Sequence, residues 1–444
     1  MKIGIVGAGP AGMFSAYELS QNKHIDITLI DMGNRVENRS ENEVMRGVGG
    51  AGTFSDGKLH FSPVLSHEKM LHLFTVKEYQ QYLDQVDKIF TDFGVDSGYY
   101  PKDMKKTTEL VEEAKKQNIR LVIRRNRHVG TDKLPNIIKK FQDTLEDRKV
   151  NLLTRTEVSD IIINGKGCEG VKLKSGEEMK FDKILLAPGR VSAKWLQDIA
   201  SKYNIPYEYE KIEVGVRVEF PSVVMKKYAD LMYEAIFLLQ SKTFEDTVRT
   251  FCPCPNGLVG IEDYDGFVCV NGHSNSDHLS ENSNFALVSE VILTEPVENT
   301  TQYGKSIAQL ATTIGGGRPI LQRLEDLKKG RRSTWKRIKK GIVIPSLTDV
   351  VPGDISMALP HRIVTNIIEG LDELNKVMPG INSGSTLLYA PEIKLRSSKI
   401  KTNKYLETNT KNLFVAGDGS GLSGNIVGAA ATGLIAAHGI LKSL

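Results

Sequence analysis

The two ends of the chain carry the same local pattern, an apolar strand that runs into glycines and then into a helix. At the start, the glycines form the motif Gly7-x-Gly9-x-x-Gly12, and a second apolar strand at 25–30 ends on Asp31. In such a unit the glycines permit a tight turn, close approach of backbone N–H groups to a pyrophosphate, and close helix–strand packing. The acidic residue can accept a ribose hydroxyl. The N-terminal pattern therefore predicts a dinucleotide-binding site.

The far end repeats the plan. An apolar strand at 412–416 is followed by Gly417 and Asp418, and further glycines lead into a small-residue helix from Ile426. NAD alone has no use for this second segment, whereas FAD is long enough to need a second phosphate and ribityl contact. Asp418 could accept a ribityl hydroxyl, and the helix N-terminus presents N–H groups and positive dipole to the O2 side of the isoalloxazine. The two ends together predict FAD as the cofactor.

The composition is that of a soluble globular protein with two domains. The 444 residues are 40% hydrophobic and 25% charged, and Lys plus Arg (58) exceed Asp plus Glu (54) by only four, which predicts no electrostatic partner. Four cysteines without an even ladder of spacings favour reduced thiols and a cytoplasmic location. We expect no export signal, because the N-terminal apolar stretch carries the dinucleotide glycines. We expect no membrane span, because the apolar stretch 426–441 is short and broken by glycines.

The order of elements predicts an α/β fold. We expect a Rossmann-like FAD-binding domain, with three layers, a parallel sheet and a β-meander, at 1–211 and 381–444, with a helical excursion at about 67–118. A second, mixed α+β substrate domain is expected at 212–380, where alternating strands such as Val214-Gly-Val-Arg-Val-Glu-Phe220 begin. Further expected elements are a strand at 121–123, a helix from Thr131 or Asp132 as N-cap to about 146, strands at 150–153, 158–163, 170–173 and 183–186, helices at 306–313, 319–329 and 362–377, and a strand at 385–395 that leads back to the nucleotide-binding sheet.

A glycine-rich stretch at 47–58 falls where the chain would pass under the flavin pyrophosphate and ring. Its glycines allow close backbone approach. Asp56 and Lys58 could then face the ring edge and act in catalysis, or they could belong to a flexible loop. Thr131 is likewise either an anion-binding group or a plain helix N-cap.

The inserted domain contains Cys252-Pro-Cys254, two thiols whose spacing places them on one face of a strand. A thiol near a flavin could be a nucleophile, a redox partner or a proton donor, and the alternative is simple packing beside prolines. No Cys or His spacing completes a zinc site, so no metal is expected. His273 belongs to a polar cluster, 271–276 with 282–284, that either lines a substrate cleft or builds Asx turns.

Basic residues concentrate at 328–340 in an otherwise balanced chain. This segment is either a solvated helix face or a docking surface for an acidic protein, RNA or anionic lipid.

Six segments together resemble a prokaryotic family of uncharacterised FAD-dependent dehydrogenases, which belongs with the glutathione-reductase-type flavoproteins whose substrate domain interrupts the FAD domain. The segments are Gly50-Ala-Gly-Thr-Phe-Ser-Asp-Gly-Lys58, His128-Val-Gly-Thr-Asp-Lys-Leu134, Phe251-Cys-Pro-Cys-Pro255, Val270-Asn-Gly-His-Ser274, Tyr389-Ala-Pro-Glu-Ile393 and Ala416-Gly-Asp-Gly-Ser-Gly-Leu422. The resemblance spans almost the whole chain, and it implies FAD contacts that include the backbone of Val158, as the adenine contact, and Gly189. The family's Cys-Pro-Gly-Gly is replaced here by Cys254-Pro-Asn-Gly257.

The candidate site residues form two sets. The expected FAD contacts are Gly7, Gly9, Pro10, Ala11, Gly12, Asp31, Gly49, Gly50, Ala51, Gly52, Val158, Gly189, Gly417, Asp418, Gly424, Asn425 and Ile426. The expected catalytic candidates are Cys252, Cys254, Lys58, Asp56 and His273.

These observations predict an FAD-dependent oxidoreductase that moves a hydride between flavin N5 and an unidentified small-molecule substrate held between the two domains. No second strand, G-x-G-x-x-G and helix unit appears, so the reductant would be transiently bound NAD(P)H, an electron-donor protein of ferredoxin type, or the substrate itself. The alternatives are a tRNA-modifying flavoenzyme that uses residues 328–340, and a non-catalytic binding protein that keeps the flavoprotein fold.

Overall fold

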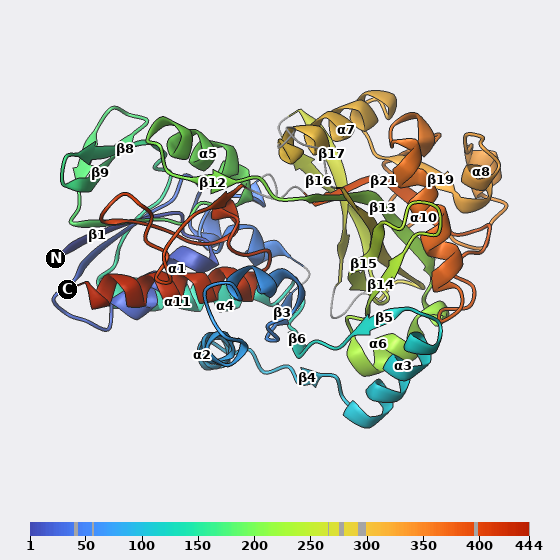
Figure 1. Cartoon of the computed structure of the whole chain (residues 1–444), viewed down its shortest axis with the longest axis horizontal. Helices are drawn as coiled ribbons and strands as arrows, with labels where there is room; N and C mark the ends of the chain where they lie inside the picture. Colours follow the sequence, from blue (N-terminus) through green and yellow to red (C-terminus); the bar gives the residue numbers. More distant parts are fainter. Residues whose placement is uncertain are drawn as a thin grey trace. The chain divides into compact units, whose positions relative to one another are not determined.

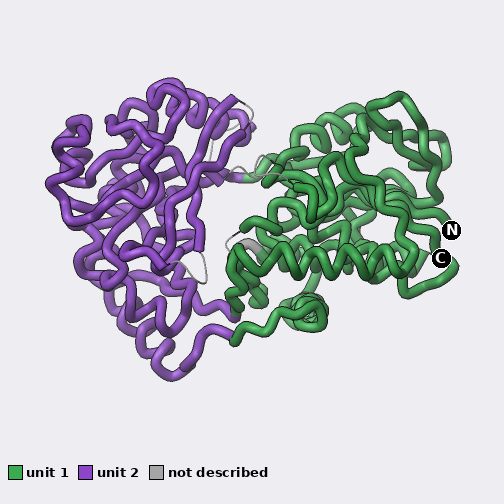
Figure 2. Tube along the Cα trace, turned by 180° about the vertical axis from the view of Figure 1, so that it is seen from behind, with its two compact units in different colours: residues 1–98, 126–210, 396–444 green, residues 99–125, 211–395 purple. Residues whose placement is uncertain are grey.

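The chain passes back and forth between two units (Figures 1 and 2). The computed structural model describes residues 1–39, 43–55, 57–264, 266–274, 279–291, 299–394 and 398–443. Unit 1 comprises Met1–Gly98, Asn126–Glu210 and Arg396–Leu444, and unit 2 comprises Tyr99–Arg125 and Lys211–Leu395. Where the sequence suggested a single insertion at 212–380, unit 2 takes in an earlier segment, 99–125, and continues to 395.

Unit 1 is built on a parallel sheet whose strands come from both ends and the middle of the chain. The strand order is β23-β11-β1-β2-β7, and every neighbouring pair is parallel. The strands are β1 (Lys2–Val6), β2 (Asp26–Ile30), β7 (Asn151–Leu153), β11 (Lys183–Leu186) and β23 (Leu413–Val415). Because all five run the same way, their carboxyl ends lie at one edge.

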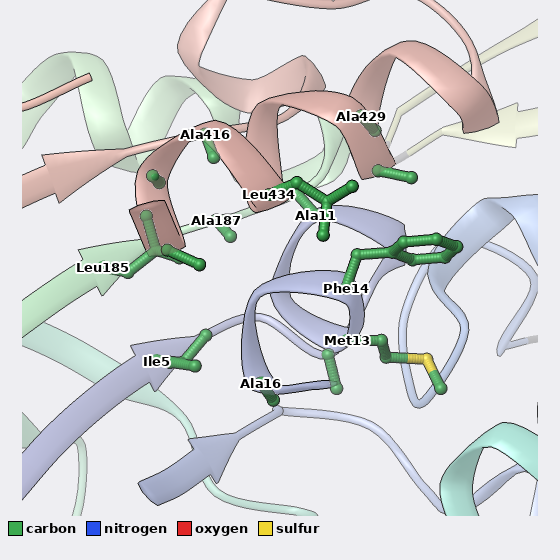
Figure 3. Close-up of a cluster of buried hydrophobic side chains, with 14 of the residues drawn as sticks. Ile5, Ala11, Met13, Phe14, Ala16, Leu185, Ala187, Ala416, Ala429 and Leu434 are labelled. Atoms are coloured by element: carbon green, nitrogen blue, oxygen red, sulfur yellow. The ribbon is translucent and has the colours of Figure 1, made fainter. Parts of the chain in front are cut away.

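Helices α1 (Pro10–Leu19) and α11 (Ile426–Lys442) lie side by side on this sheet (Figure 1). Helix α11 is buried nearly all round, as its small apolar residues require. A Cβ atom at Gly433 would lie 2.1 Å from the carbonyl oxygen of Ala11, so only glycine permits this approach. Figure 3 shows Ala11 and Phe14 of α1 beside Leu434 of α11 in the core.

The remaining elements of unit 1 surround this core. Strands β8, β9 and β10 form an antiparallel meander, and β8 and β9 coincide with the strands predicted at 158–163 and 170–173. Strand β3 pairs with β6. These elements are β3 (Lys58–His60), α2 (Val76–Asp92), β6 (Asn126–His128), α4 (Leu134–Asp147), β8 (Val158–Asn164), β9 (Gly167–Leu173), β10 (Glu178–Lys180), α5 (Ala193–Lys202), β12 (Tyr207–Glu208) and β22 (Lys399–Ile400).

Unit 2 is built on an eight-stranded sheet in the order β20-β19-β21-β13-β18-β15-β14-β5, which is antiparallel apart from the pair β19–β20. The strands are β5 (Arg120–Val122), β13 (Ile212–Pro221), β14 (Ile236–Gln240), β15 (Thr247–Cys254), β18 (Asn282–Val291), β19 (Ile320–Arg323), β20 (Val351–Pro352) and β21 (Leu387–Lys394). A separate hairpin, β16 (Leu258–Tyr264) and β17 (Phe267–His273), packs against it. The helices are α3 (Met104–Lys116), α6 (Lys226–Met232), α7 (Thr300–Ile314), α8 (Leu324–Lys328), α9 (Trp335–Ile338) and α10 (His361–Leu374).

Strand β13 shows why the sheet of unit 2 has two different faces. Val214, Val216 and Val218 pack in the apolar core that includes α10. The alternate residues Arg217 and Glu219 are also fully buried, on the opposite face. Since successive side chains of a strand point to opposite faces, the alternating sequence produces one apolar face and one buried polar face.

Three individual elements differ from the sequence expectations. The segment expected as a helix at 319–329 begins with strand β19, because Ile320 pairs with Ala390 of β21. The strand at 385–395 does not lead back to the nucleotide-binding sheet, because β21 pairs with β13 and β19 in unit 2. Helix α4 is capped neither by Thr131 nor by Asp132, since its N-cap is Lys133 and the Thr131 hydroxyl donates to the carbonyl of Ser55 (2.7 Å).

The helical excursion expected at 67–118 is divided between the units. Helix α2 packs against α11 in unit 1, whereas α3 packs against β5 and α6 in unit 2. The short strand expected at 121–123 is β5, which pairs with β14. The predicted fold class is confirmed: a Rossmann-like α/β unit with a parallel sheet and a meander is interrupted by a second unit of helices and strands.

Within the described ranges, no helix combines the length and apolar character that crossing a membrane requires.

Candidate functional site

The carboxyl edge of the parallel sheet gathers the dinucleotide-binding segments from both ends of the chain. Gly7 directly follows β1, and its N–H donates to the carbonyl of Ile30 (2.7 Å). Ala416 directly follows β23, and its N–H donates to the carbonyl of Leu186 (3.0 Å). Ligands of open α/β sheets bind at this edge. The two glycine-rich segments therefore lie where the fold places its ligand.

Two glycines of the N-terminal motif are required by the packing. Gly7 has φ +104°, and a Cβ there would lie 2.3 Å from the carbonyl oxygen of Ala187. A Cβ at Gly12 would lie 1.9 Å from the oxygen of Gly7. Gly9 differs, because a Cβ there meets no atom nearer than 3.9 Å.

The first turn of α1 is open to an anion. Gly9 is its N-cap, Pro10 occupies the first turn, and no described side chain caps it. The first N–H groups of a helix have no acceptor within the helix. The N–H groups of Ala11 and Gly12 therefore form a small anion-binding surface.

Asp31 organises the turn around this helix. Its Oδ2 accepts from the N–H of Ala8 (2.8 Å), and its Oδ1 accepts from Gly33 (2.8 Å) and Gly47 (2.9 Å). A carboxylate offers about four acceptor positions. Asp31 therefore fixes the loops on both sides and keeps acceptor capacity for a ribose hydroxyl.

The glycine-rich stretch after Asp31 is held by Arg39, which sequence reasoning missed. The Nη1 of Arg39 donates to the carbonyls of Val48 (2.8 Å) and Gly50 (3.0 Å) and to the hydroxyl of Thr53 (2.9 Å). Burial lowers the pKa of Arg39 to about 10 against the opposing effects of Asp31 and Glu43. An isolated arginine between two motifs carries no pattern, so only the folded loop shows its role.

The glycine-rich stretch contains a 3-10 helix and leads into strand β3. Gly49 has φ +85° and precedes a 3-10 helix, Gly50–Phe54, that contains Ala51 and Gly52. Lys58 lies in β3 opposite His128 and is only 3% exposed. Asp56 lies outside the described residues.

Asp418 lies in the C-terminal glycine-rich segment at the carboxyl edge of the sheet. Two described side chains contact its carboxylate. Its Oδ1 accepts from the hydroxyl of Ser423, and its Oδ2 lies 3.7 Å from Nε of Arg190. Gly417, at φ +81°, donates its N–H to Thr432 of α11 (2.9 Å). Gly189 comes directly before Arg190. The sequence identified Gly189 and Asp418 separately, but not the arginine that links them.

Asn425 is the N-cap of α11, and its side-chain oxygen accepts from the N–H of Gly428 (2.8 Å). Its Nδ2 lies 3.2 Å from Nε2 of His67, which is buried and also contacts the hydroxyl of Tyr79 through Nδ1 (3.1 Å). His67 thus supports the cap, although no sequence motif marks it.

The C-terminal helix also meets the glycine stretch. A Cβ at Gly52 would lie 3.1 Å from Cγ1 of Ile426, while Gly424, just before the cap, is exposed. Val158 begins β8 and pairs with Leu173.

Unit 2 contains a cluster of polar groups around Arg217, which is fully buried on β13. Its Nε donates to Oδ1 of Asn284 (2.7 Å), and its Nη2 donates to the carbonyl of Cys252 (2.7 Å) and to Sγ of Cys254 (3.2 Å). Its Nη1 lies 3.7 Å from Oε2 of Glu392. Three strands of unit 2, β15, β18 and β21, thus direct polar groups at one guanidinium.

The two cysteines do not form the regular strand pair that their spacing predicted. The ladder between β15 and β18 shifts register between Phe251 and Cys254, and Cys252 has φ +44°. A bulge adds a residue and breaks the alternation of faces. Cys254 is fully buried against Arg217, whereas Cys252 is half-buried.

His273 is half-buried on β17, and a Cβ at Gly260 would lie 2.2 Å from its Nε2. The ring therefore lies over the hairpin backbone. Of the remaining polar cluster, residues 275–276 lie outside the described ranges.

Glu392 is buried at 3% exposure, and burial raises its pKa from 4.5 to about 7. The nearby charges of Arg217 and Lys394 oppose this rise, and those of Glu262 and Cys254 add to it. Among the described residues, its Oε2 has no hydrogen-bond partner.

The raised pKa of Glu392 predicts a pH-dependent stability. The folded protein holds this proton more tightly than the unfolded chain, so the stabilisation is complete below the ordinary pKa of 4.5 and is lost as the pH rises through about 7. We expect the free energy of unfolding to fall by about 3 kcal/mol across this range from this group alone. Urea unfolding at a series of pH values measures it, and Glu392→Gln should remove that part of the slope. An unchanged slope in the variant would assign it to other groups.

A second buried carboxylate, Glu219, lies on β13 two residues after Arg217. Its Oε2 accepts from the hydroxyl of Tyr389 (2.5 Å), and its Oε1 accepts from Nδ2 of Asn282 (3.1 Å). Burial and the adjacent Glu219 raise the pKa of Tyr389 well above its ordinary value. Arg217 and Glu219 thus each have their own hydrogen-bonding partners on the buried polar face of the sheet.

At least three of the eight basic residues at 328–340 form ion pairs within unit 2. Lys328 pairs with Asp372, Lys329 with Glu325, and Arg331 with Asp326. No group of three or more His, Cys, Asp or Glu residues in the described part of the chain is arranged to hold a metal ion.

Family models match a segment of each unit. Residues 211–395 match the family model described as the C-terminal domain of FAD-dependent proteins, and residues 5–75 match the NAD(P)-binding Rossmann-like domain. A curated protein of Clostridium beijerinckii, described as uncharacterized, is 25% identical over 472 aligned residues, which cover 99% of this chain and 80% of that protein. These domain matches confirm FAD as the cofactor and support an FAD-dependent oxidoreductase.

Superposition of this chain on solved structures gives low TM-scores. Glycine oxidase of Bacillus cereus is 11% identical with a TM-score of 0.41, covering 100% of this chain and 95% of that one. L-proline dehydrogenase of P. horikoshii is 13% identical with a TM-score of 0.40, covering 100% and 93%. At these scores the overlaps say nothing about the substrate of this chain.

Proposed function

We propose that this chain is an FAD-dependent oxidoreductase that moves a hydride between flavin N5 and a polar small molecule bound by unit 2. One observation carries the proposal. Glycine-rich segments from the two ends of the chain meet at the carboxyl edge of one parallel sheet, with the N-terminus of α1 at the first segment and that of α11 following the second.

The residues at this edge fit FAD. The N–H groups of Ala11 and Gly12 would hold the pyrophosphate, since Gly9 leaves open space beside them and none of the described side chains caps the turn. Asp31 would accept from the adenosine ribose with its remaining acceptor capacity. The backbone of Val158 would contact the adenine.

The flavin half of FAD would lie at the C-terminal segment. Asp418, held by Ser423 and near Arg190, would accept from the ribityl chain. Asn425 and Ile426 would present the N-terminus of α11 to the O2 side of the ring, where the helix dipole favours negative charge. When bound, FAD supplies hydride transfer at N5. The glycine stretch 49–52 would support the cofactor through its backbone, with Arg39 fixing its conformation.

Unit 2 is the candidate substrate-binding unit, and its buried polar face supplies candidate catalytic groups. Burying Arg217, Glu219 and Glu392 is costly unless each charge is satisfied or used. Of the predicted catalytic candidates, Cys252, Cys254 and His273 belong to unit 2, while Lys58 belongs to unit 1. The tRNA-modifying alternative receives less support, because Lys328, Lys329 and Arg331 are already paired.

Visible flavin absorbance of the purified protein tests the cofactor assignment. We expect a yellow holoprotein whose flavin bleaches anaerobically with one reductant from a panel of NADH, NADPH, reduced ferredoxin and small metabolites. Reoxidation by a second compound would identify the acceptor. A colourless protein that cannot be reconstituted with FAD would contradict the proposal, and salt-sensitive retention of tRNA by the holoprotein would favour the alternative.

A further inference from the structure

We propose that Cys254 and Glu392 share one negative charge across the guanidinium of Arg217, with Cys254 as the thiolate and Glu392 as the protonated acid at neutral pH. This charge state stands apart from the redox proposal. Its use as a proton source or acceptor that accompanies hydride transfer rests on the proposed function.

The contacts favour the sulfur as the charged atom. The Nη2 of Arg217 donates directly to Sγ of Cys254 at 3.2 Å, whereas the Nη1 lies 3.7 Å from Oε2 of Glu392, beyond hydrogen-bond reach. A neighbouring arginine stabilises a thiolate. A Cβ at Gly272 would lie 1.7 Å from Nη2 of Arg217 and 2.7 Å from Sγ of Cys254, so the hairpin backbone closes over this contact.

A single guanidinium cannot compensate two buried anions at full strength. Arg217, Cys254 and Glu392 are all buried, at 0%, 0% and 3% exposure. When two acids compete for one cation in a low-dielectric site, the first ionisation opposes the second. The exchange is balanced: thiol plus carboxylate gives thiolate plus carboxylic acid, with one proton leaving Sγ, one arriving at Oε2, and no change in net charge or oxidation state.

The other charged groups around Glu392 leave this balance in place. Lys394 favours the carboxylate, while Glu262, on the covering hairpin, favours the acid. Cys269 pairs with Glu262 across that hairpin, and burial raises the pKa of its thiol well above the ordinary value, so it stays neutral. The pKa of Glu392, raised to about 7, agrees with a carboxyl group that keeps its proton near neutrality.

The chain supplies its own control thiols. Burial raises the pKa of Cys168 to about 11 and raises that of Cys269 well above its ordinary value. Neither should ionise near neutral pH.

The ultraviolet thiolate band of the FAD-loaded full chain tests the proposal, measured as the difference between the unmodified protein and Cys254→Ser so that the flavin absorbance cancels. At about pH 6.5, below the pKa of Glu392, we expect about one thiolate per chain, against about a hundredth for an ordinary thiol. Cys269→Ser should leave the band unchanged. Equal spectra for the unmodified protein and Cys254→Ser would overturn the proposal.

Cys254→Ser also tests the coupling. Removing the competing anion should lower the pKa of Glu392, so the part of the pH-dependent stability assigned to Glu392 should shift to lower pH, and an unchanged pH profile would overturn the shared charge. If Cys254→Ser does not fold, the variants Cys168→Ser, Cys252→Ser and Cys269→Ser make the assignment, since each should retain the whole band. Loss of the band in any of them would overturn it. Flavin bleaching is measured separately, so failure of the redox proposal would leave this result distinct.

Discussion

Replacing Gly12 with alanine is expected to weaken FAD binding by at least about 100-fold, or about 3 kcal/mol. The new Cβ would lie 1.9 Å from the carbonyl oxygen of Gly7, and both partners are backbone, so the turn between β1 and α1 must move. Moving the turn displaces the N–H groups proposed to hold the pyrophosphate. Overpacking of this kind also costs about 1–3 kcal/mol of stability. Titration with FAD and urea unfolding measure the two effects.

Gly9 and Gly165 separate binding from folding. A Cβ at Gly165, in the turn between β8 and β9, meets no atom within 4 Å, so Gly165→Ala should change neither stability nor FAD affinity. Gly9→Ala should fold normally, because its Cβ comes no nearer than 3.9 Å to another atom. It should still weaken FAD binding, because the methyl group would stand beside the N–H groups of α1. Full FAD affinity in both Gly9→Ala and Gly12→Ala would contradict the pyrophosphate assignment.

The dinucleotide-binding half of the fold could be predicted because its determinants are local. Gly7 and Gly12 meet backbone atoms within a few residues or on the adjacent strand, so their spacing is visible in any sequence with this turn. The burial of α11 follows from its own composition. Asp31 was predicted from its distance to the glycines, although its three backbone contacts were not.

The chemistry of unit 2 could not be predicted, because it depends on long-range pairing. The alternation in β13 is typical of an ordinary half-buried strand. Arg217 is enclosed because the β16–β17 hairpin and β15, which are distant in sequence, pack over it. Glu392 comes from a strand that the sequence assigned to the other domain. The segment after Pro319 has apolar residues compatible with helix or strand, and pairing with β21 decides between them.

Arg217→Met is expected to destabilise the protein by about 3–5 kcal/mol. The substitution keeps much of the side-chain volume but leaves the negative charge that Cys254 shares with Glu392 buried without its cation. It also removes the donors to Oδ1 of Asn284 and to the carbonyl of Cys252. A buried acceptor that loses its donor bears its full desolvation cost. Urea unfolding measures the change, and flavin absorbance reports whether the nucleotide-binding unit remains folded.

A surface arginine provides the matched control. Arg362 makes a two-pronged ion pair with Asp246, but its side chain is 58% exposed, so Arg362→Met should change the free energy of unfolding far less than Arg217→Met. Adding Cys254→Ser to Arg217→Met should recover about 1–3 kcal/mol, because the buried thiolate that Arg217 compensates is then absent. Equal losses for the two arginine variants, or no recovery in the double variant, would show that Arg217 does not compensate a buried negative charge.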